Sequence, residues 1–210
     1  MPEKLCLGIF ASGRGSNFTA ILEAIDRGDL DAAVGILVSN HADAGAMATA
    51  ESRGIPTIAV ERSSFETSDA YSDFLIEQMK QHEVNLIALA GYMKKIPAKF
   101  ITHFKNRIVN IHPALLPDFG GQGMYGIRVH KAVIEAGAKF SGATIHLVDE
   151  EYDRGPVIAQ SKVPVLPGDT PEILAARVLE TEHKLYPETL RRMAKGFVVE
   201  NGNVKFSFKQ

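Results

Sequence analysis

Two polar side chains, Asn110 and His112, stand two residues apart at the end of an apolar run that predicts a β-strand, residues 108–111. On a strand such residues share a face, and Pro113 then ends the sheet ladder. Ligands bind at the carboxyl ends of strands in open α/β sheets. An amide donor beside an imidazole that can carry a proton suits stabilisation of an oxyanion in acyl transfer. The alternative is a capped strand end with a hydrogen-bonded histidine.

A glycine-rich turn follows the first predicted strand, at residues 11–17, and contains Gly13 and Gly15. Exposed backbone amides at the start of a helix attract phosphate. The third glycine of the dinucleotide fingerprint is missing, and Ser39-Asn40 stand where an acid would bind a ribose. The turn therefore favours a monophosphate over a dinucleotide, and its alternative is an ordinary turn with a helix cap.

Two further residues have spacing that could bring them to the same site. His146 lies in an alternating strand, residues 143–148, and the acidic segment 149–153 ends in Asp153. Gly155-Pro156 restricts the backbone there and could turn Asp153 inward. The alternatives are a structural histidine and a solvated acidic turn.

Other reactive residue types indicate no second chemistry. Cys6 is the single cysteine and sits in the first predicted strand, where inert packing is expected. Ser16 is predicted to cap a helix, because the chain has no Gly-x-Ser-x-Gly elbow. The remaining histidines lack metal-ligand spacing, so no metal is expected.

Apolar runs of strand type alternate with amphipathic helical segments, a pattern typical of α/β proteins. We predict a doubly wound, mostly parallel, Rossmann-like sheet flanked by helices, with a long C-terminal helix. Residues 1–210 are expected to form one domain, with a phosphate-binding half to about 110, a catalytic half over about 111–195, and a tail, 196–210, with a hairpin over 198–208. The predicted strands are 5–10, 33–39, 57–60, 84–90, 108–111, 143–148 and 157–163, and the predicted helices are 17–27, 44–53, 68–81, 129–136 and 171–195.

The composition is that of an ordinary globular protein, with 45% hydrophobic and 23% charged residues. A net charge of −2 gives no basic footprint for nucleic acid. No apolar run reaches the ~20 residues of a membrane span, and the first residues lack the pattern of a signal peptide. We expect a cytoplasmic protein without nucleic-acid or membrane partners, either a monomer or a homodimer.

Four segments together resemble the folate-dependent formyltransferases, over about residues 4–195. Within that family they resemble the branch that formylates glycinamide ribonucleotide in purine biosynthesis. The resemblance implies 10-formyltetrahydrofolate as co-substrate and no metal. The segments are Ser12-Gly13-Arg14-Gly15-Ser16-Asn17, Asn110-x-His112-Pro113-Ala114-Leu115-Leu116-Pro117, Asp153-Arg154-Gly155-Pro156 and Glu182-His183-Lys184-Leu185-Tyr186-Pro187.

The same resemblance implies roles for individual residues. Asn110, His112 and Asp153 are the catalytic set, with His146 as a supporting residue. Gly15, Ser16 and Asn17 hold the ribonucleotide phosphate, and Glu182 contacts the same substrate. The residues that line the folate pocket are Met93, Lys94, Lys95, Ile96, Asn110, Asp149, Glu150, Glu151 and Tyr152. The chain departs from the family's usual residues at Ser68, Lys94 and Lys95, and the loop 120–126 is longer than in some members.

The mechanism implied is direct attack of the substrate amine on the formyl carbon. Asn110 and His112 stabilise the tetrahedral intermediate, and Asp153 is expected to orient His112 and raise its pKa. The rivals are methionyl-tRNA formyltransferase, which has an added tRNA-binding domain, and formyltetrahydrofolate deformylase, which has an added regulatory domain. A nucleotide-phosphate-binding module without activity is a third alternative.

Overall fold

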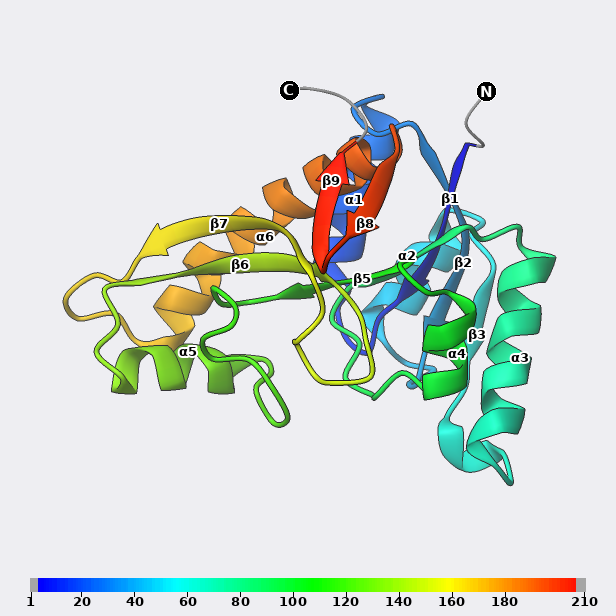
Figure 1. Cartoon of the computed structure of the whole chain (residues 1–210), viewed down its shortest axis with the longest axis horizontal. Coiled ribbons are helices and arrows are strands. Elements are labelled where there is room, and N and C mark those ends of the chain that lie inside the picture. Colours follow the sequence, from blue (N-terminus) through cyan, green and yellow to red (C-terminus); the bar gives the residue numbers. More distant parts are fainter. Residues whose placement is uncertain (1–3, 207–210) are drawn as a thin grey trace. The chain divides into compact units, whose positions relative to one another are not determined.

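The computed structural model describes residues 4–206, which divide into two compact units with the boundary between Val109 and Asn110. The strands form a seven-stranded sheet of order β3-β2-β1-β4-β5-β6-β7 and a separate two-stranded sheet, β8-β9. The mostly parallel sheet and its flanking helices confirm the predicted fold class (Figure 1).

The first unit contains parallel strands connected by helices. β1 pairs with β2 and β4, and β2 pairs with β3, all in parallel register. The carboxyl halves of β1, β2 and β4 are almost fully buried, as expected of strands covered on both faces of the sheet. The elements are β1 Leu5–Phe10, α1 Ser16–Asp26, β2 Ala32–Ser39, α2 Gly45–Ser52, β3 Thr57–Ala59, η1 Arg62–Ser64, α3 Ser68–Gln81, β4 Leu86–Leu89 and α4 Ala98–His103.

Two short elements of this unit were not predicted, the 3₁₀ turn η1 and the helix α4. α4 has six residues and buries only Phe100 and Ile101, so it shows too little of the 3.6-residue period to be recognised. By contrast α3, whose buried positions recur over fourteen residues, has the predicted bounds.

The second unit contains an antiparallel pair of strands, β6 and β7, packed on the long helix α6. The hydrophobic core of this unit includes Ala143 of β6, Leu174 and Val178 of α6, and Val133 of α5. Thr170 caps α6 by accepting a hydrogen bond from the Ile173 amide, and Pro171 occupies its first turn. The elements are β5 Ile108–His112, which crosses the unit boundary, α5 Ile127–Glu135, β6 Phe140–Leu147, β7 Val157–Pro164, α6 Pro171–Met193, β8 Phe197–Glu200 and β9 Asn203–Phe206.

The predicted hairpin is formed by β8 and β9 around Asn201-Gly202, both of which have positive φ. Residues 207 and 208 of that prediction lie outside the described part of the chain.

Candidate functional site

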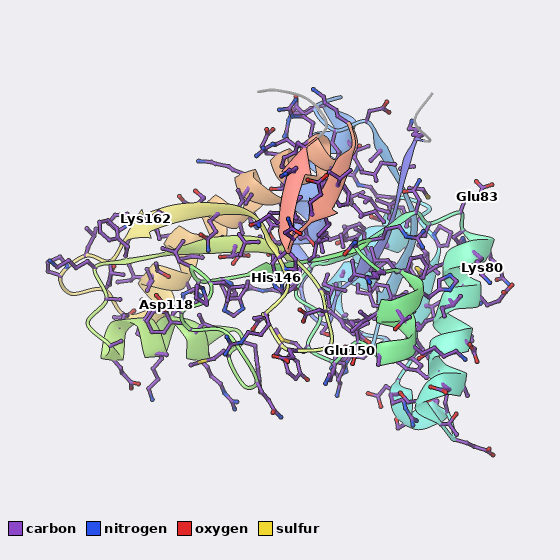
Figure 2. The ribbon with its side chains drawn as sticks, viewed as in Figure 1. Lys80, Glu83, Asp118, His146, Glu150 and Lys162 are labelled. Atoms are coloured by element: carbon purple, nitrogen blue, oxygen red, sulfur yellow. The ribbon has the colours of Figure 1, made fainter. Side chains whose placement is uncertain are left out.

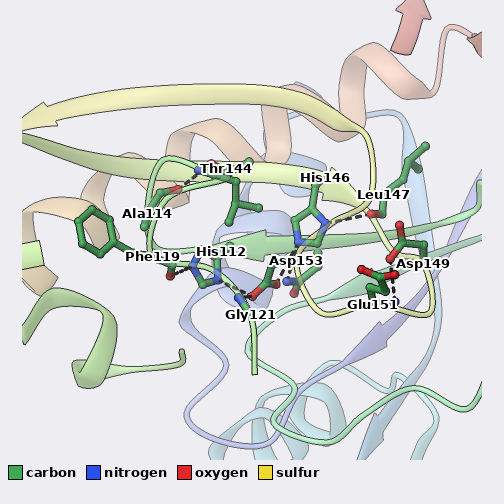
Figure 3. A network of polar contacts seen from close by, with 12 residues as sticks. His112, Ala114, Phe119, Gly121, Thr144, His146, Leu147, Asp149, Glu151 and Asp153 are labelled. Carbon is green, nitrogen blue, oxygen red and sulfur yellow. Dashed lines mark hydrogen bonds and ion pairs between the residues drawn. The ribbon is translucent and has the colours of Figure 1, made fainter. Parts of the chain in front are cut away.

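Four polar side chains of the second unit form one cluster, which we call the polar cluster: Asn110, His112, His146 and Asp153 (Figure 3). His112 is 3% exposed and His146 is 2% exposed, although histidine is a polar residue. The oxygens of Asp153 lie 3.6 Å from Nδ1 of His112 and 3.5 Å from Nε2 of His146. The structure thus brings Asn110, His112 and Asp153 close together, with His146 beside them.

His146 fixes the orientation of the Asn110 amide. Nδ1 of His146 lies 2.9 Å from the carbonyl oxygen of Leu147, which can only accept, so Nδ1 carries the proton. In the neutral ring Nε2 is then an acceptor and takes a hydrogen bond from the Asn110 side-chain nitrogen at 3.1 Å. One amide hydrogen of Asn110 is thereby held in place, and the second can be donated to a substrate oxygen.

His112 is held between a backbone carbonyl and a carboxylate. Its Nε2 donates to the carbonyl oxygen of Phe119 at 2.8 Å, and its Nδ1 faces Asp153. Burial lowers the pKa of His112, and this outweighs the Asp153 carboxylate and the Phe119 carbonyl, which raise it. The Asp153 carboxylate therefore acts on the His112 pKa in the expected direction, but burial, which was not foreseen, makes the net shift a lowering.

Asp153 points into the cluster because of its local backbone. Its φ is +57°, and a Cβ at the nearby buried Gly155 would overlap the carbonyl oxygen of Leu147, so glycine is required there. The Gly121 amide donates to Oδ2 of Asp153 at 2.9 Å. Burial raises the pKa of Asp153, but the net pKa is lowered, with contributions from the charge of His112 and from the hydrogen bond donated by the Gly121 amide. Asp153 is thus an ionised carboxylate beside two imidazoles.

Supporting contacts from Thr144 were not predicted. Its hydroxyl donates to the Ala114 carbonyl at 2.6 Å and accepts from the Leu116 amide at 3.1 Å, which fixes the segment after His112 (Figure 3). Gln160 donates to the Leu116 carbonyl and to the Thr144 hydroxyl. The signal in the sequence was the position of Thr144, two residues before His146 on the same strand face.

The predicted phosphate turn lies in the first unit and opens α1. Gly15 is the N-cap with φ +76°, and Ser16 is the first helical residue. The prediction that Ser16 caps the helix is therefore wrong. A Cβ at Gly15 would lie 2.7 Å from that of Ala46 on α2, so the backbone approaches α2 too closely for a side chain. Asn17 is 7% exposed.

The residues expected to line folate differ in exposure. Met93 is 53% exposed and its neighbours Lys94 and Lys95 are exposed, whereas Ile96 is buried. In the second unit, Glu150 is exposed on the loop that follows β6, in contrast to the buried His146 (Figure 2). Asp149 accepts from the Glu151 amide, Glu151 and Tyr152 are exposed, and Glu182 is buried on α6.

The described residues contain neither a candidate metal cluster nor a helix that could span a membrane. Among residues 4–206, no group of three or more His, Cys, Asp or Glu side chains is arranged to hold a metal ion. No helix within that range has the length and apolar character needed to cross a membrane.

Comparison with known proteins places this arrangement in a family. Residues 7–190 match the family described as formyl transferase. The chain belongs to the formyl transferase family. It is 49% identical over 190 residues to a protein of Arabidopsis thaliana named "Phosphoribosylglycinamide formyltransferase, chloroplastic", a match covering 90% of this chain and 65% of the relative. The chain thus spans just under two thirds of that relative's length.

Bacterial members of the formyl transferase family match over nearly their whole length. A phosphoribosylglycinamide formyltransferase of Bacillus subtilis is 40% identical, with 88% of this chain and 92% of the relative covered. The crystal structure of glycinamide ribonucleotide transformylase 1 from Symbiobacterium toebii has a TM-score of 0.90 at 36% identity, with 97% and 94% covered.

Proposed function

We propose that the chain transfers the formyl group of 10-formyltetrahydrofolate to the amine of glycinamide ribonucleotide, a step of purine biosynthesis. The observation that carries this proposal is the polar cluster, which places an amide donor, an imidazole donor and a carboxylate together in a chain of the formyl transferase family. The identity of the substrate is proposed from the names of the relatives, and the type of reaction from the side chains of the polar cluster.

In this mechanism the substrate amine attacks the formyl carbon and forms a tetrahedral intermediate with a negative oxygen. The free amide hydrogen of Asn110 and the Nε2 hydrogen of His112 stabilise that oxygen, the latter in place of the Phe119 carbonyl. The bond from the formyl carbon to the folate nitrogen then breaks, and a proton from the attacking amine passes to that nitrogen. Asp153 compensates positive charge that develops on His112 or the amine.

Each substrate is proposed to have its own set of binding residues. Gly15, Ser16 and Asn17 bind the ribonucleotide phosphate, supported by the left-handed N-cap at the start of α1. Glu182 binds the rest of that substrate. Folate contacts come from residues 93–96, Asn110 and the acidic segment 149–152, with no metal ion in the reaction.

The remaining features are proposed at a coarser level. The chain is proposed to act as one formyltransferase domain, with phosphate binding up to about residue 110, catalysis over about 111–195 and a tail after it. We also propose a monomer or homodimer in the cytoplasm, where a single free cysteine, Cys6, suits reducing conditions. Size-exclusion chromatography with light scattering and cell fractionation test these two points.

One assay separates this function from its rivals. The purified protein is mixed with 10-formyltetrahydrofolate, and the absorbance change of the folate is recorded with glycinamide ribonucleotide, with methionyl-tRNA and with neither, each in the presence and absence of EDTA. We expect turnover only with the ribonucleotide, unaffected by EDTA, and a large loss in His112→Ala. Formate release without the ribonucleotide indicates a deformylase, and formylation of methionyl-tRNA indicates the tRNA enzyme. A rise in Tm with the ribonucleotide but no transfer indicates a binding module.

A further inference from the structure

Asn40 directly follows β2, where a dinucleotide-binding fold would present an acid to a ribose. Here the side chain points inward and is 4% exposed. Its Oδ1 accepts a hydrogen bond from the Ser12 hydroxyl at 2.5 Å. Its Nδ2 is buried and has no hydrogen-bond partner among the described residues. Burying an amide N–H without a partner lowers the stability of the fold. We therefore ask what the hydrogen bond between Asn40 and Ser12 contributes in return.

Ser12 connects Asn40 to a segment far away in the sequence. The Met93 amide donates to the Ser12 hydroxyl oxygen at 2.8 Å, and the Ser12 amide donates to the Gly91 carbonyl at 3.1 Å. A hydroxyl has one proton and two lone pairs. Because Asn40 accepts that proton, a lone pair of Ser12 is directed to the Met93 amide.

Ser12 also belongs to the predicted phosphate turn, residues 11–17, which packs closely against the start of α2. The Gly13 carbonyl accepts from the Ala46 amide at 3.1 Å, and Gly15 has no space for a side chain against Ala46. The turn that opens α1 and the segment that follows β4 therefore share Ser12 as a common anchor. All of these contacts lie within the first unit.

We propose that Ser12 and Asn40 are positioning residues that hold the phosphate turn and the segment 91–96 in one geometry, so that a phosphate bound at the turn strengthens folate binding at Met93. The coupling part of this proposal rests on the proposed function. Binding at the turn orders residues 12–17, and the Ser12 hydroxyl passes that order to the Met93 backbone. Residues 91–96 then lose less conformational entropy when the folate binds, so the folate binds more tightly.

The first test needs no ligand. Hydrogen exchange of the Met93 amide is measured by NMR in wild type, Ser12→Ala and Asn40→Ala. We expect exchange ~3–10-fold faster in Ser12→Ala, the effect of losing one hydrogen bond, and a smaller rise in Asn40→Ala. Ser12→Thr keeps the hydroxyl and should restore protection. Ser52→Ala is the matched control, because its hydroxyl bonds only within the exposed end of α2.

The second test measures coupling. Calorimetry gives the Kd of tetrahydrofolate, which cannot transfer formyl, with and without saturating glycinamide ribonucleotide. We expect the ribonucleotide to lower this Kd at least ~5-fold in wild type and by a factor near one in Ser12→Ala, with Ser12→Thr and Ser52→Ala like wild type. An equal factor in wild type and Ser12→Ala, or Met93 exchange unchanged in Ser12→Ala, overturns the proposal. If wild type binds neither ligand, the proposed function fails, while the exchange test still decides whether Ser12 and Asn40 position Met93.

Discussion

The side-chain nitrogen of Asn110 donates to Nε2 of His146 at 3.1 Å. The Leu147 carbonyl fixes the tautomer of His146, so the imidazole in turn fixes which end of the Asn110 amide faces the cluster. His146 thus controls the direction of the Asn110 amide, the hydrogen-bond donor that we propose for the reaction, without itself needing to touch the substrate.

Replacement of His146 by Phe should therefore lower kcat with little change in KM. Phe fills similar volume but removes the acceptor, so the Asn110 amide can rotate away, and misplacement of a catalytic group costs ~10²-fold in rate. Steady-state kinetics with both substrates measures the effect. His146→Gln, which retains an acceptor, should recover part of kcat, and an unchanged kcat in His146→Phe would show that Asn110 is oriented by other groups.

Replacement of Asp153 by Asn should lower kcat roughly 10²–10⁴-fold, as for other sites with an oriented histidine. The KM values should change much less, because the carboxylate acts on charge that develops during the reaction. Since the Asp153 carboxylate raises the pKa of His112 against the effect of burial, the variant should also lower that pKa further. NMR titration of the imidazole nitrogens measures this shift.

The double variant with His112→Ala tests whether the two residues act as a unit. Its kcat should be little lower than that of the worse single variant. Losses that multiply would show that Asp153 acts independently of His112, and an upward shift of the His112 pKa in Asp153→Asn would contradict the electrostatic account.

Much of this site could be predicted because its members have local sequence signals. Proline after His112 marks a strand end, and Gly155-Pro156 marks a restricted turn, so both positions follow from backbone chemistry. The long strongly periodic helices α3 and α6 likewise follow from apolar spacing.

The net pKa of His112 could not be predicted in the same way. Its sign depends on the balance between burial and the charge of Asp153, and burial is known only once the chain is folded. The Phe119 carbonyl and the Gly121 amide were also missed, because backbone groups can be supplied by any residue type. The link from Ser12 to Met93 joins segments whose sequences carry no shared pattern.

The phosphate turn is tested by a matched pair of glycine substitutions. Gly15→Ala should destabilise the protein by ~1–2 kcal/mol, because φ is +76° and the new Cβ would meet Ala46. It should also raise the KM for the ribonucleotide much more than the KM for folate. At Gly13, a Cβ would meet no atom of the described residues within 4 Å, so Gly13→Ala should be close to neutral in stability.

Urea unfolding and steady-state kinetics measure both variants. Equal changes in the two KM values, or an unaltered ribonucleotide KM in a folded Gly15→Ala protein, would show that the turn has a structural role only.

The last prediction concerns a third buried imidazole, His130 on α5, which is 4% exposed and whose Nδ1 has no hydrogen-bond partner among residues 4–206. Burial, with a contribution from the charge of His112, lowers its pKa from 6.5 to about 4. The unfolded chain therefore binds the proton more readily between these values. The stability associated with neutral His130 is present above pH 6.5 and is lost as the pH falls toward about 4.

His130→Gln removes the titrating group and keeps a polar side chain. The difference in free energy of unfolding between wild type and this variant should change by up to ~1.4 kcal/mol per pH unit below about pH 6, with wild type losing more. Urea unfolding at pH 7.5, 6 and 5 measures it, and subtraction removes the similar contribution of His112, whose pKa is also lowered. Parallel stability curves for the two proteins would show that His130 has an ordinary pKa and that its burial is relieved in solution.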